Sequence, residues 1–313
     1  MSQSVSSRPV TAVIVTYHSA RTIDKTLAAA RRCYDANLLD VIIVDNNSGD
    51  ASAEIIGRET NWAQVILSGK NNGFGRGCNI GFARVNSPYT IFINPDAQVE
   101  PDTMRAMLEF MEQNPNAGIV GPATACGEDE GNKSYQHTGL RPTPVTILRS
   151  CIPFLRRPSL SWVVRPGSAP ARTGWVCGAV LMIRTDLLRS LGGFDPRFFL
   201  YWEETDLCKR VEDAGFGNWV IGNALARHIV GASSTGGVVR YGGAVARHYY
   251  QSRYYYMVKH HGWWTATIAD VTEFLYCGMQ AMWDILRGRN TQRIQQRLQA
   301  PLFSMPERQT DED

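Results

Sequence analysis

Short apolar runs alternate with segments of helical periodicity over the first 120 residues. The runs are rich in Val and Ile, and they lie at 10–16, 41–44, 64–67, 89–93 and 118–121. Runs of this length and composition predict strands that are buried on both faces of a sheet. Helical periodicity falls between them, near 20–34, 51–58, 76–86 and 101–113. This alternation predicts the α/β class, a Rossmann-like and mostly parallel sheet with helices on both sides.

The second half of the chain is less regular. A strand is predicted over 173–184, a helix over 185–191, and an acidic helix within 201–216. Residues 140–175 hold six Arg, six Pro and no acid, and predict an irregular loop. That loop is either solvated or a basic surface that meets an anionic surface or substrate. Residues 241–264 hold eight aromatic side chains, and 284–300 mixes Arg with apolar residues.

Composition and charge narrow the function classes. The chain has 313 residues, of which 44% are hydrophobic and 19% charged, a composition typical of a globular protein. Its net charge is only +3, so its overall electrostatic potential gives no reason to expect binding to nucleic acid. No two of its seven cysteines lie closer than 25 residues, which excludes CxxC sites and favours a reducing cytoplasm. We expect no signal peptide and no membrane span, because no apolar run is long enough for either.

The glycine-rich segment N-N-G-F-G-R-G-C-N-I-G (71–81) does not fit a dinucleotide fingerprint. Gly73 and Gly75 would need a glycine at position 78, which is Cys78, and the segment follows the third strand. A Walker loop fails as well, because Lys70 lacks the required neighbours. The segment predicts a loop at a helix start where a phosphate or sugar can approach the backbone.

Two aspartates follow predicted strands. Asp45 ends V-I-I-V-D, and Asp96 ends I-F-I-N-P-D. A carboxylate at this end of a strand can accept a hydrogen bond from a nucleotide or bind a hard cation. Each alone is typical of a turn or cap residue. Together, on neighbouring strands, they favour a nucleotide–metal site.

Three carboxylates stand at the start of the acidic helix: Glu203, Glu204 and Asp206. The helix dipole favours acids there, and Asp206 can pair with Arg210 one turn later. The segment is therefore either a charged helix terminus or a source of acid–base groups. His228, in A-R-H-I-V-G-A-S-S, is either a structural histidine or a metal ligand.

Taken in order, the motifs resemble the family 2 inverting glycosyltransferases of the GT-A fold, in particular their bacterial rhamnosyltransferase-like branch. The resemblance covers roughly residues 9–235. The motifs that carry it are V-T-A-V-I-V-T-Y-H-S, V-I-I-V-D-N-N-S-G-D, N-N-G-F-G-R-G-C-N-I-G, I-F-I-N-P-D-A, W-V-C-G-A-V-L-M-I-R and F-F-L-Y-W-E-E-T-D-L-C-K-R.

The resemblance implies roles for named residues. Asp96 would be the surviving carboxylate of the metal motif, with His228 as a further ligand of Mg²⁺ or Mn²⁺. Glu204 would be the catalytic base, with Glu203 and Asp206 as the alternatives. The residues implied for the nucleotide sugar are Thr16, Tyr17, Asp45, Asn72, Gly73, Arg76, Asn79, Asn94 and Asp96.

Two departures from the family pattern stand out. The family's D-x-D is N-P-D here, so Asn94 is no anionic ligand, and the family's E-D pair is E-E, which puts Glu204 where an aspartate is usual. The N-P-D-A form resembles enzymes that use dTDP-L-rhamnose to build O-antigen or related cell-surface polysaccharide. The implied acceptor is a glycan or a lipid-linked saccharide.

The predicted organisation has three parts. They are a GT-A transferase domain at 1–235 (nucleotide-binding half 9–122, acceptor and catalytic half 173–235), a helical extension at 236–300 and a mobile tail at 301–313. We expect the protein in the cytoplasm. Either the basic loop and 284–300 contact the inner face of the cytoplasmic membrane, or the C-terminal extension is a helical cap that packs its aromatic side chains inside. The alternatives are a nucleotidyltransferase acting on sugar phosphates and a non-catalytic sugar- or lipid-binding module.

Overall fold

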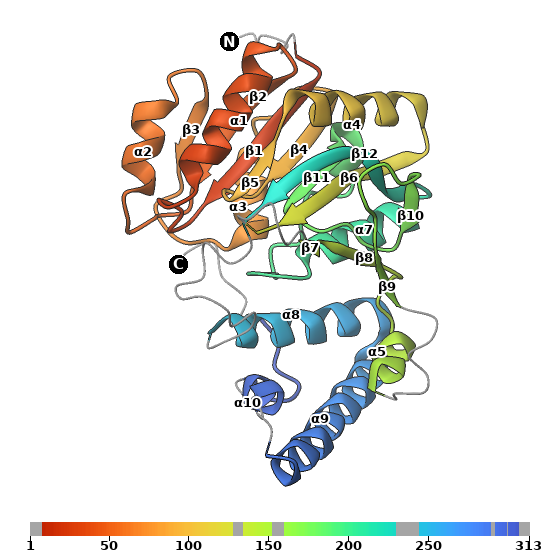
Figure 1. Ribbon diagram of the computed structural model, residues 1–313. Helices are drawn as coiled ribbons and strands as arrows, with labels where there is room; N and C mark the ends of the chain where they lie inside the picture. The colour runs from red at the N-terminus through yellow and green to blue at the C-terminus, as the bar shows by residue number, and fades with distance from the viewer. Residues whose placement is uncertain are drawn as a thin grey trace.

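The computed structural model describes residues 8–127, 134–151, 160–229, 244–288, 292–298 and 300–306. Its centre is a ten-stranded sheet covered by helices on both faces, with further helices to one side (Figure 1). The predicted domain boundary at 235 lies outside these residues, as do 307–313 of the predicted tail and part of the basic loop.

The first half follows the predicted alternation of strands and helices. Its elements are β1 (Val10–Thr16), α1 (Ile23–Asp35), β2 (Leu39–Asp45), α2 (Ser52–Glu59), β3 (Gln64–Leu67), α3 (Phe74–Phe82), β4 (Tyr89–Ile93), β5 (Ala97–Val99), α4 (Pro101–Gln113) and β6 (Ala117–Cys126). Every element predicted for this half is present, and the short strand β5 is an addition.

The second half completes the sheet and adds the helices beside it. Its elements are β7 (Ser134–Tyr135), β8 (His137–Gly139), α5 (Pro144–Cys151), β9 (Ser161–Val163), β10 (Ala171–Thr173), β11 (Val180–Arg184), α6 (Thr185–Ser190), α7 (Glu203–Asp213), β12 (Gly217–His228), α8 (Ala244–His261), α9 (Trp263–Leu286) and α10 (Gln292–Leu298). The predicted C-terminal helices are thereby confirmed.

The sheet is mixed but mostly parallel, as predicted. Its order is β10-β12-β6-β11-β4-β1-β2-β3, with β5 on β12 and β7 on β6. β1 runs parallel to β2 and β4, β2 to β3, and β6 to β12. β11 is antiparallel to both of its neighbours, β4 and β6.

Three predictions for individual segments were wrong. β3 is an edge strand with Leu67 70% exposed, so it is not buried on both faces. The single strand predicted at 173–184 is two strands, because 174–179 leaves the sheet between β10 and β11. The described part of the basic loop contains α5, β9 and β10 instead of irregular chain. The long strand β12 was not predicted, although buried and exposed residues alternate along its second half.

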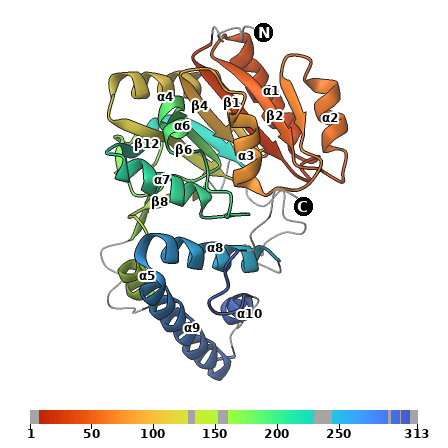
Figure 2. The same cartoon turned by 180° about the vertical axis from the view of Figure 1, so that it is seen from behind.

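Two apolar cores lie on opposite faces of the sheet. One packs under α1, α2 and α4, and the other under α3, α6 and α7, which Figure 2 shows from behind. α3 lies very close to β1, because a Cβ on Gly77 or Gly81 would come within 2.7 or 2.5 Å of a valine side chain. Helix α3 therefore owes its position to glycines that the sequence suggested for ligand contact.

Helices α5, α8, α9 and α10 form a lobe on one side of the sheet (Figures 1 and 2). α8, α9 and α10 are held together by a buried network in which Arg253 and Arg297 both pair with Asp270 and Glu273. Ser304 accepts a hydrogen bond from Gln251 of α8 at 2.8 Å. Residues 301–306, predicted as part of a mobile tail, thus contact this lobe. No helix among the described residues has both the length and the apolar character needed to cross a bilayer.

A fully buried carboxylate joins the lobe to the sheet domain. Asp206 of α7 lies 2.8 Å from Arg210 Nε, 2.6 Å from Lys259 Nζ and 2.7 Å from His260 Nε2, and the last two residues belong to α8. Burial alone would raise the pKa of Asp206. The hydrogen bond from His260 and the charges of Arg210 and Lys259 outweigh burial and lower that pKa to about 2.

We expect Asp206→Asn to destabilise the protein by about 3–5 kcal/mol, because Arg210 and Lys259 would lose their buried counter-charge. The free energy of unfolding from urea titration measures this. Asp213→Asn, which removes an exposed pair with Lys209, is the control and should cost less than about 1 kcal/mol. Because the native pKa lies below that of the unfolded chain, the contribution of Asp206 should be complete above about pH 4 and lost as the pH falls through about 2. Equal losses in the two variants would contradict this assignment.

Candidate active site

The carboxyl ends of β1 and β2 place two predicted nucleotide ligands side by side. Thr16 and Asp45 are register partners, and Thr16 Oγ1 donates to Asp45 Oδ1 at 2.9 Å. Asp45 Oδ2 accepts from the Ser48 backbone N–H at 3.0 Å, which fixes the carboxylate within its turn. The ring of Tyr17, which follows β1, is exposed and lies edge-on to His18. A buried carboxylate beside an accessible aromatic ring suits a nucleotide base.

The glycine-rich loop is held against this strand end by Asn46, which the sequence did not single out. Asn46 Nδ2 donates to the Gly73 carbonyl at 2.9 Å, and its Oδ1 accepts from the Asn72 backbone N–H at 3.3 Å. Gly73 has φ = 75°, and a Cβ there would lie 2.3 Å from the Phe199 carbonyl oxygen. The group that approaches Gly73 closely is therefore the backbone of Phe199, whereas the sequence suggested a phosphate or sugar.

Two further residues predicted for the donor have protein partners. Asn79 pairs with the Phe194 backbone through both ends of its amide, at 2.8 and 2.9 Å. Arg76 Nε donates to the Pro196 carbonyl at 3.0 Å. These bonds fasten α3 to residues 194–199, the segment that leads into the acidic motif.

Asp96 and His228, predicted as metal ligands, are brought into contact by the sheet. β5 pairs with β12 so that His228 faces Ala97, next to Asp96. Asp96 Oδ1 lies 3.0 Å from His228 Nε2, and both side chains are buried. The other ring nitrogen of His228 is hydrogen-bonded to Gln136. The predicted pair therefore exists, and Gln136 orients its imidazole, as outer partners of metal-binding histidines do.

The side chains of Asp96 and His228 suit a divalent cation that is also bound by the substrate. The described residues contain no cluster of three or more His, Cys, Asp or Glu side chains able to hold a metal. Mg²⁺ is commonly held by one or two protein groups, with phosphates and water supplying the remaining ligands. Asp96 and His228 match that arrangement, in which a diphosphate completes the coordination.

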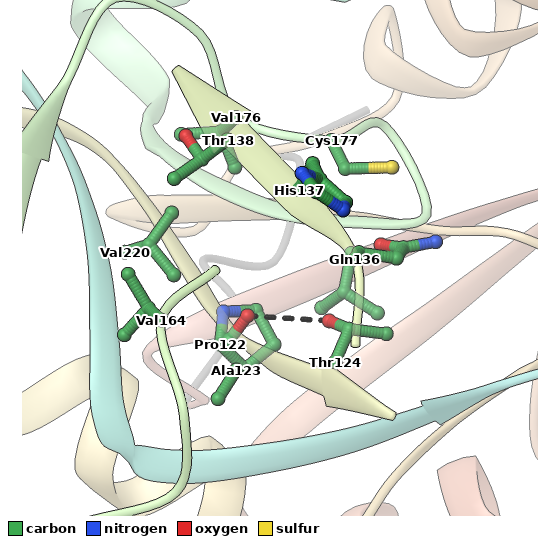
Figure 3. Close-up of a pocket in the computed structure, with 11 residues that line it drawn as sticks. Pro122, Ala123, Thr124, Gln136, His137, Thr138, Val164, Val176, Cys177 and Val220 are labelled. Carbon is green, nitrogen blue, oxygen red and sulfur yellow. Dashed lines mark hydrogen bonds between the residues drawn. The ribbon is translucent and has the colours of Figure 1, made fainter. Parts of the chain in front are cut away.

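A small pocket is lined by residues of β6, β8 and 176–180, together with Gln136, Val164 and Val220 (Figure 3). Gln136, which binds His228, lines it together with Cys177 and Thr124, whose hydroxyl donates to the Pro122 carbonyl at 3.2 Å. Valines from three segments form much of the remaining wall. Gln136 is thus the link between this pocket and the Asp96–His228 pair.

Glu203 and Glu204 begin α7 after an unusual turn. Tyr201 and Trp202, which precede them, have φ of 66° and 72°, a left-handed conformation that costs residues other than glycine about 1–3 kcal/mol. α8 holds this turn, because Trp202 packs on Tyr256 with ring centroids 5.2 Å apart and Ser252 donates to the Leu200 carbonyl at 3.0 Å. The lobe therefore stabilises the turn that determines the orientation of Glu203 and Glu204.

The two glutamates point to different surroundings. Glu203 lies near Gly75 of α3, whereas Glu204 lies against Gly178, about 3.5 Å from where a Cβ would stand. Burial raises the pKa of Glu203 well above its usual value, and the neighbouring charge of Glu204 adds to the effect. Burial also raises the pKa of Glu204, to about 7, against the opposing effect of backbone hydrogen bonds. Within the described part of the chain, Oε2 of each glutamate is buried without a hydrogen-bond partner.

Residues 177–179 connect Glu204 with the strand-end site. The Asn94 backbone N–H donates to the Ala179 carbonyl at 2.9 Å, directly after β4. Gly178 contacts Glu204, and the pKa of Cys177 is raised to about 12, first by burial and then by nearby charges that include Glu204 and Asp96. Glu204, Asn94 and Asp96 therefore surround one short segment and belong to one site.

Asp206 lacks the properties of a base. Its two oxygens are already engaged by Arg210, Lys259 and the His260 imidazole, and its lowered pKa makes it a poor proton acceptor. Its partners Lys259 and His260 were not predicted, because nothing in the sequence links residues more than fifty positions apart.

Comparison with known proteins agrees with this geometry. Residues 11–172 match the family model described as Glycosyl transferase family 2. The chain is 26% identical over 234 residues to the N-acetylglucosaminyl-diphospho-decaprenol L-rhamnosyltransferase of Mycobacterium tuberculosis, covering 69% of this chain and 74% of that protein. It is 26% identical over 157 residues to the rhamnosyltransferase WbbL of Escherichia coli, covering 48% of this chain and 58% of that one.

Its fold resembles that of the mannosyltransferase PcManGT of Pyrobaculum calidifontis, solved with GDP-Man and Mn²⁺. The TM-score is 0.58 at 15% identity, covering 93% of this chain and 85% of the other. The family match spans more than half of the chain, and the sheet order and C-terminal helices are those of a GT-A-type fold. The chain belongs to glycosyltransferase family 2.

Proposed function

We propose that this glycosyltransferase moves L-rhamnose from dTDP-L-rhamnose to a hydroxyl of a lipid-linked saccharide or other cell-surface glycan, with inversion at the anomeric carbon. The observation that carries the proposal is the grouping of Asp45, Asp96 and Glu204 around one edge of the sheet, with Oε2 of Glu204 lacking a hydrogen-bond partner among the described residues. The choice of sugar and acceptor rests on the rhamnosyltransferases it resembles, one of which is named for a decaprenol-linked acceptor.

The donor would bind across the carboxyl ends of β1, β2 and β4. Asp45 would accept a hydrogen bond from the nucleotide, with its orientation maintained by Thr16, and Tyr17 would cover the base. Asn94 would meet the donor as a neutral hydrogen-bonding group. Arg76 and Asn79 would act indirectly, through the segment 194–199 that they hold.

Asp96 and His228 would hold Mg²⁺ or Mn²⁺ against the diphosphate. Such an ion supplies positive charge that stabilises the negative charge developing on the leaving group. The protein's own part is positional, since the pairing of β5 with β12 holds both ligands and Gln136 orients the imidazole.

Glu204 would be the base. The acceptor hydroxyl oxygen forms a bond to the anomeric carbon on the face opposite the diphosphate, and the bond from that carbon to the diphosphate oxygen breaks. The hydroxyl proton passes to Glu204, whose raised pKa near neutrality allows it to accept a proton effectively once ionised. Glu203, more deeply buried, would stay protonated and support the helix start.

We expect Glu204→Gln to lower kcat by about 10² to 10⁴ and to leave the donor Kd nearly unchanged, because the amide cannot accept the proton. Glu203→Gln is the matched control and should retain most activity, since it replaces a protonated acid with a group of similar shape. In wild type, kcat should rise with pH through about 7 as Glu204 ionises. Initial rates of dTDP release measure kcat in both variants and its pH dependence in wild type, and calorimetric titration of dTDP measures the Kd of the nucleotide. Collapse in Glu203→Gln with turnover preserved in Glu204→Gln would assign the base to Glu203.

Asp96→Asn should abolish the Mn²⁺-dependent part of dTDP binding, because it removes the anionic metal ligand. Calorimetric titration of dTDP with and without Mn²⁺ measures the difference. Asp45→Asn, an identical change at the end of β2, which β1 separates from β4, should weaken dTDP binding equally with and without the metal. If Asp96→Asn keeps the full response to Mn²⁺, Asp96 is not the metal ligand.

The donor base can be tested by thermal unfolding with nucleotides. In the presence of Mg²⁺, dTDP should raise Tm more than UDP or GDP at equal concentration, since a nucleotide at 100 times its Kd adds about 2.7 kcal/mol. Equal shifts for the three nucleotides would argue against a thymidine nucleotide as the natural donor.

A further inference from the structure

Helix α9 is oriented with its charges inward. Asp270 and Glu273 are buried and pair with Arg253 of α8 and Arg297 of α10. The opposite face carries large apolar residues that are about half to three-quarters exposed: Trp264, Ile268, Leu275, Met279, Met282 and Leu286. An amphipathic helix normally packs its apolar face on the core, so this arrangement is the reverse of the usual one.

The exposed residues form one continuous stripe. Their spacing of three, four or seven positions places them on a single side of the helix. The stripe runs from Trp264 to Leu286 of α9, so it extends over about 33 Å. Val145 of α5, which packs against α9, is a further exposed apolar side chain of this lobe. No described residue covers the stripe, because every member remains largely exposed.

The ends of the stripe have the character of a membrane interface. Trp263 and Trp264 stand at its start and Trp283 near its end. The guanidinium of Arg287, just beyond the helix, lies 4.2 Å from the Trp283 ring centroid. Tryptophans concentrate at the level of lipid headgroups, and basic residues there attract anionic lipid. The stripe itself carries no acidic side chain that would repel an anionic membrane surface, and the positive charge of Arg287 at its end is attracted to one.

We infer that α9 lies in the headgroup region of an anionic bilayer, with its apolar stripe inserted among the acyl chains. A single-helix ridge of Trp, Leu, Ile and Met inserts readily into lipid, whereas a stable protein interface needs about 800 Å² of complementary surface per partner. The inference rests on the proposed function in one respect, that a lipid-linked acceptor would be presented at such a surface.

The stripe is mechanically connected to the active site. α8 leads into α9 through Gly262 alone, whose φ is 83°. α8 also holds Trp202 through Tyr256 and Asp206 through His260. Docking of α9 would therefore hold Glu204 at a constant height above the membrane. The membrane contact lies on residues 263–287. It overlaps the predicted segment 284–300 only at residues 284–287 and does not include the basic loop.

The test is flotation of the full chain with vesicles of phosphatidylcholine containing about 30% phosphatidylglycerol. Wild type should float, and vesicles of phosphatidylcholine alone should bind it severalfold less. The double variant Leu275→Glu/Met279→Glu, at two positions that are each 60% exposed, should weaken binding at least about tenfold. Leu67→Glu on edge strand β3, 70% exposed and far from α9, is the matched control and should bind as wild type does.

Gel filtration and dTDP-induced thermal shifts of the same variants separate the outcomes. Unchanged shifts in the double variant would show that the fold and the donor site are intact, so loss of flotation would be due to the stripe. Wild type that does not float, or a double variant that floats equally well, would overturn the inference whether or not the enzyme transfers rhamnose. A wild-type dimer that the double variant dissociates would also overturn it, by making the stripe an interface between copies of the chain.

Discussion

The geometry of the active site depends on one buried charge. Asp206 is the only one of the three acids of the first turn of α7 to be paired with cations among the described residues, and two of its partners come from α8. Because those cations would be costly to leave unpaired in the interior, α7 and α8 are tied together at that point. The left-handed turn at Tyr201 and Trp202 lies between them, and the aromatic surface of α8 keeps it in place.

Within one helical turn, three carboxylates have acquired three different proton affinities. Asp206 is surrounded by positive charge and has a lowered pKa, whereas Glu203 and Glu204 are buried without such partners and have raised ones. Environments that separate the pKa values of neighbouring acids are typical of catalytic sites. The pairing of Asp206 thus leaves Glu203 and Glu204 as the candidates for acid–base chemistry, and Glu204 is the one that lies against Gly178, near the end of β4.

The C-terminal helices serve both halves of this arrangement. α8 supplies the cations and the aromatic surface for the acidic motif, and α9 turns its charges toward α8 and its apolar side chains outward. Four charged groups are therefore buried between these helices, where a helical lobe normally buries apolar side chains. Such a lobe is stable only because Arg253 and Arg297 each meet two carboxylates, and this pairing leaves the apolar face of α9 free for a lipid surface.

The sequence by itself determined the alternation of strands and helices and the placement of Asp45 and Asp96 after strands, because these follow from local periodicity and turn chemistry. It also placed three acids at the start of one helix. Tertiary structure alone decided which of them could act, since the environment of Asp206 comes from His260, 54 positions away. It likewise decided that Gly73 and Asn79 serve packing and that Gln136 supports His228, because contacts across the sheet leave no trace in local sequence. The direction of α9 was decided in the same way, because a helix's charged face turns inward only where partners such as Arg253 and Arg297 meet it.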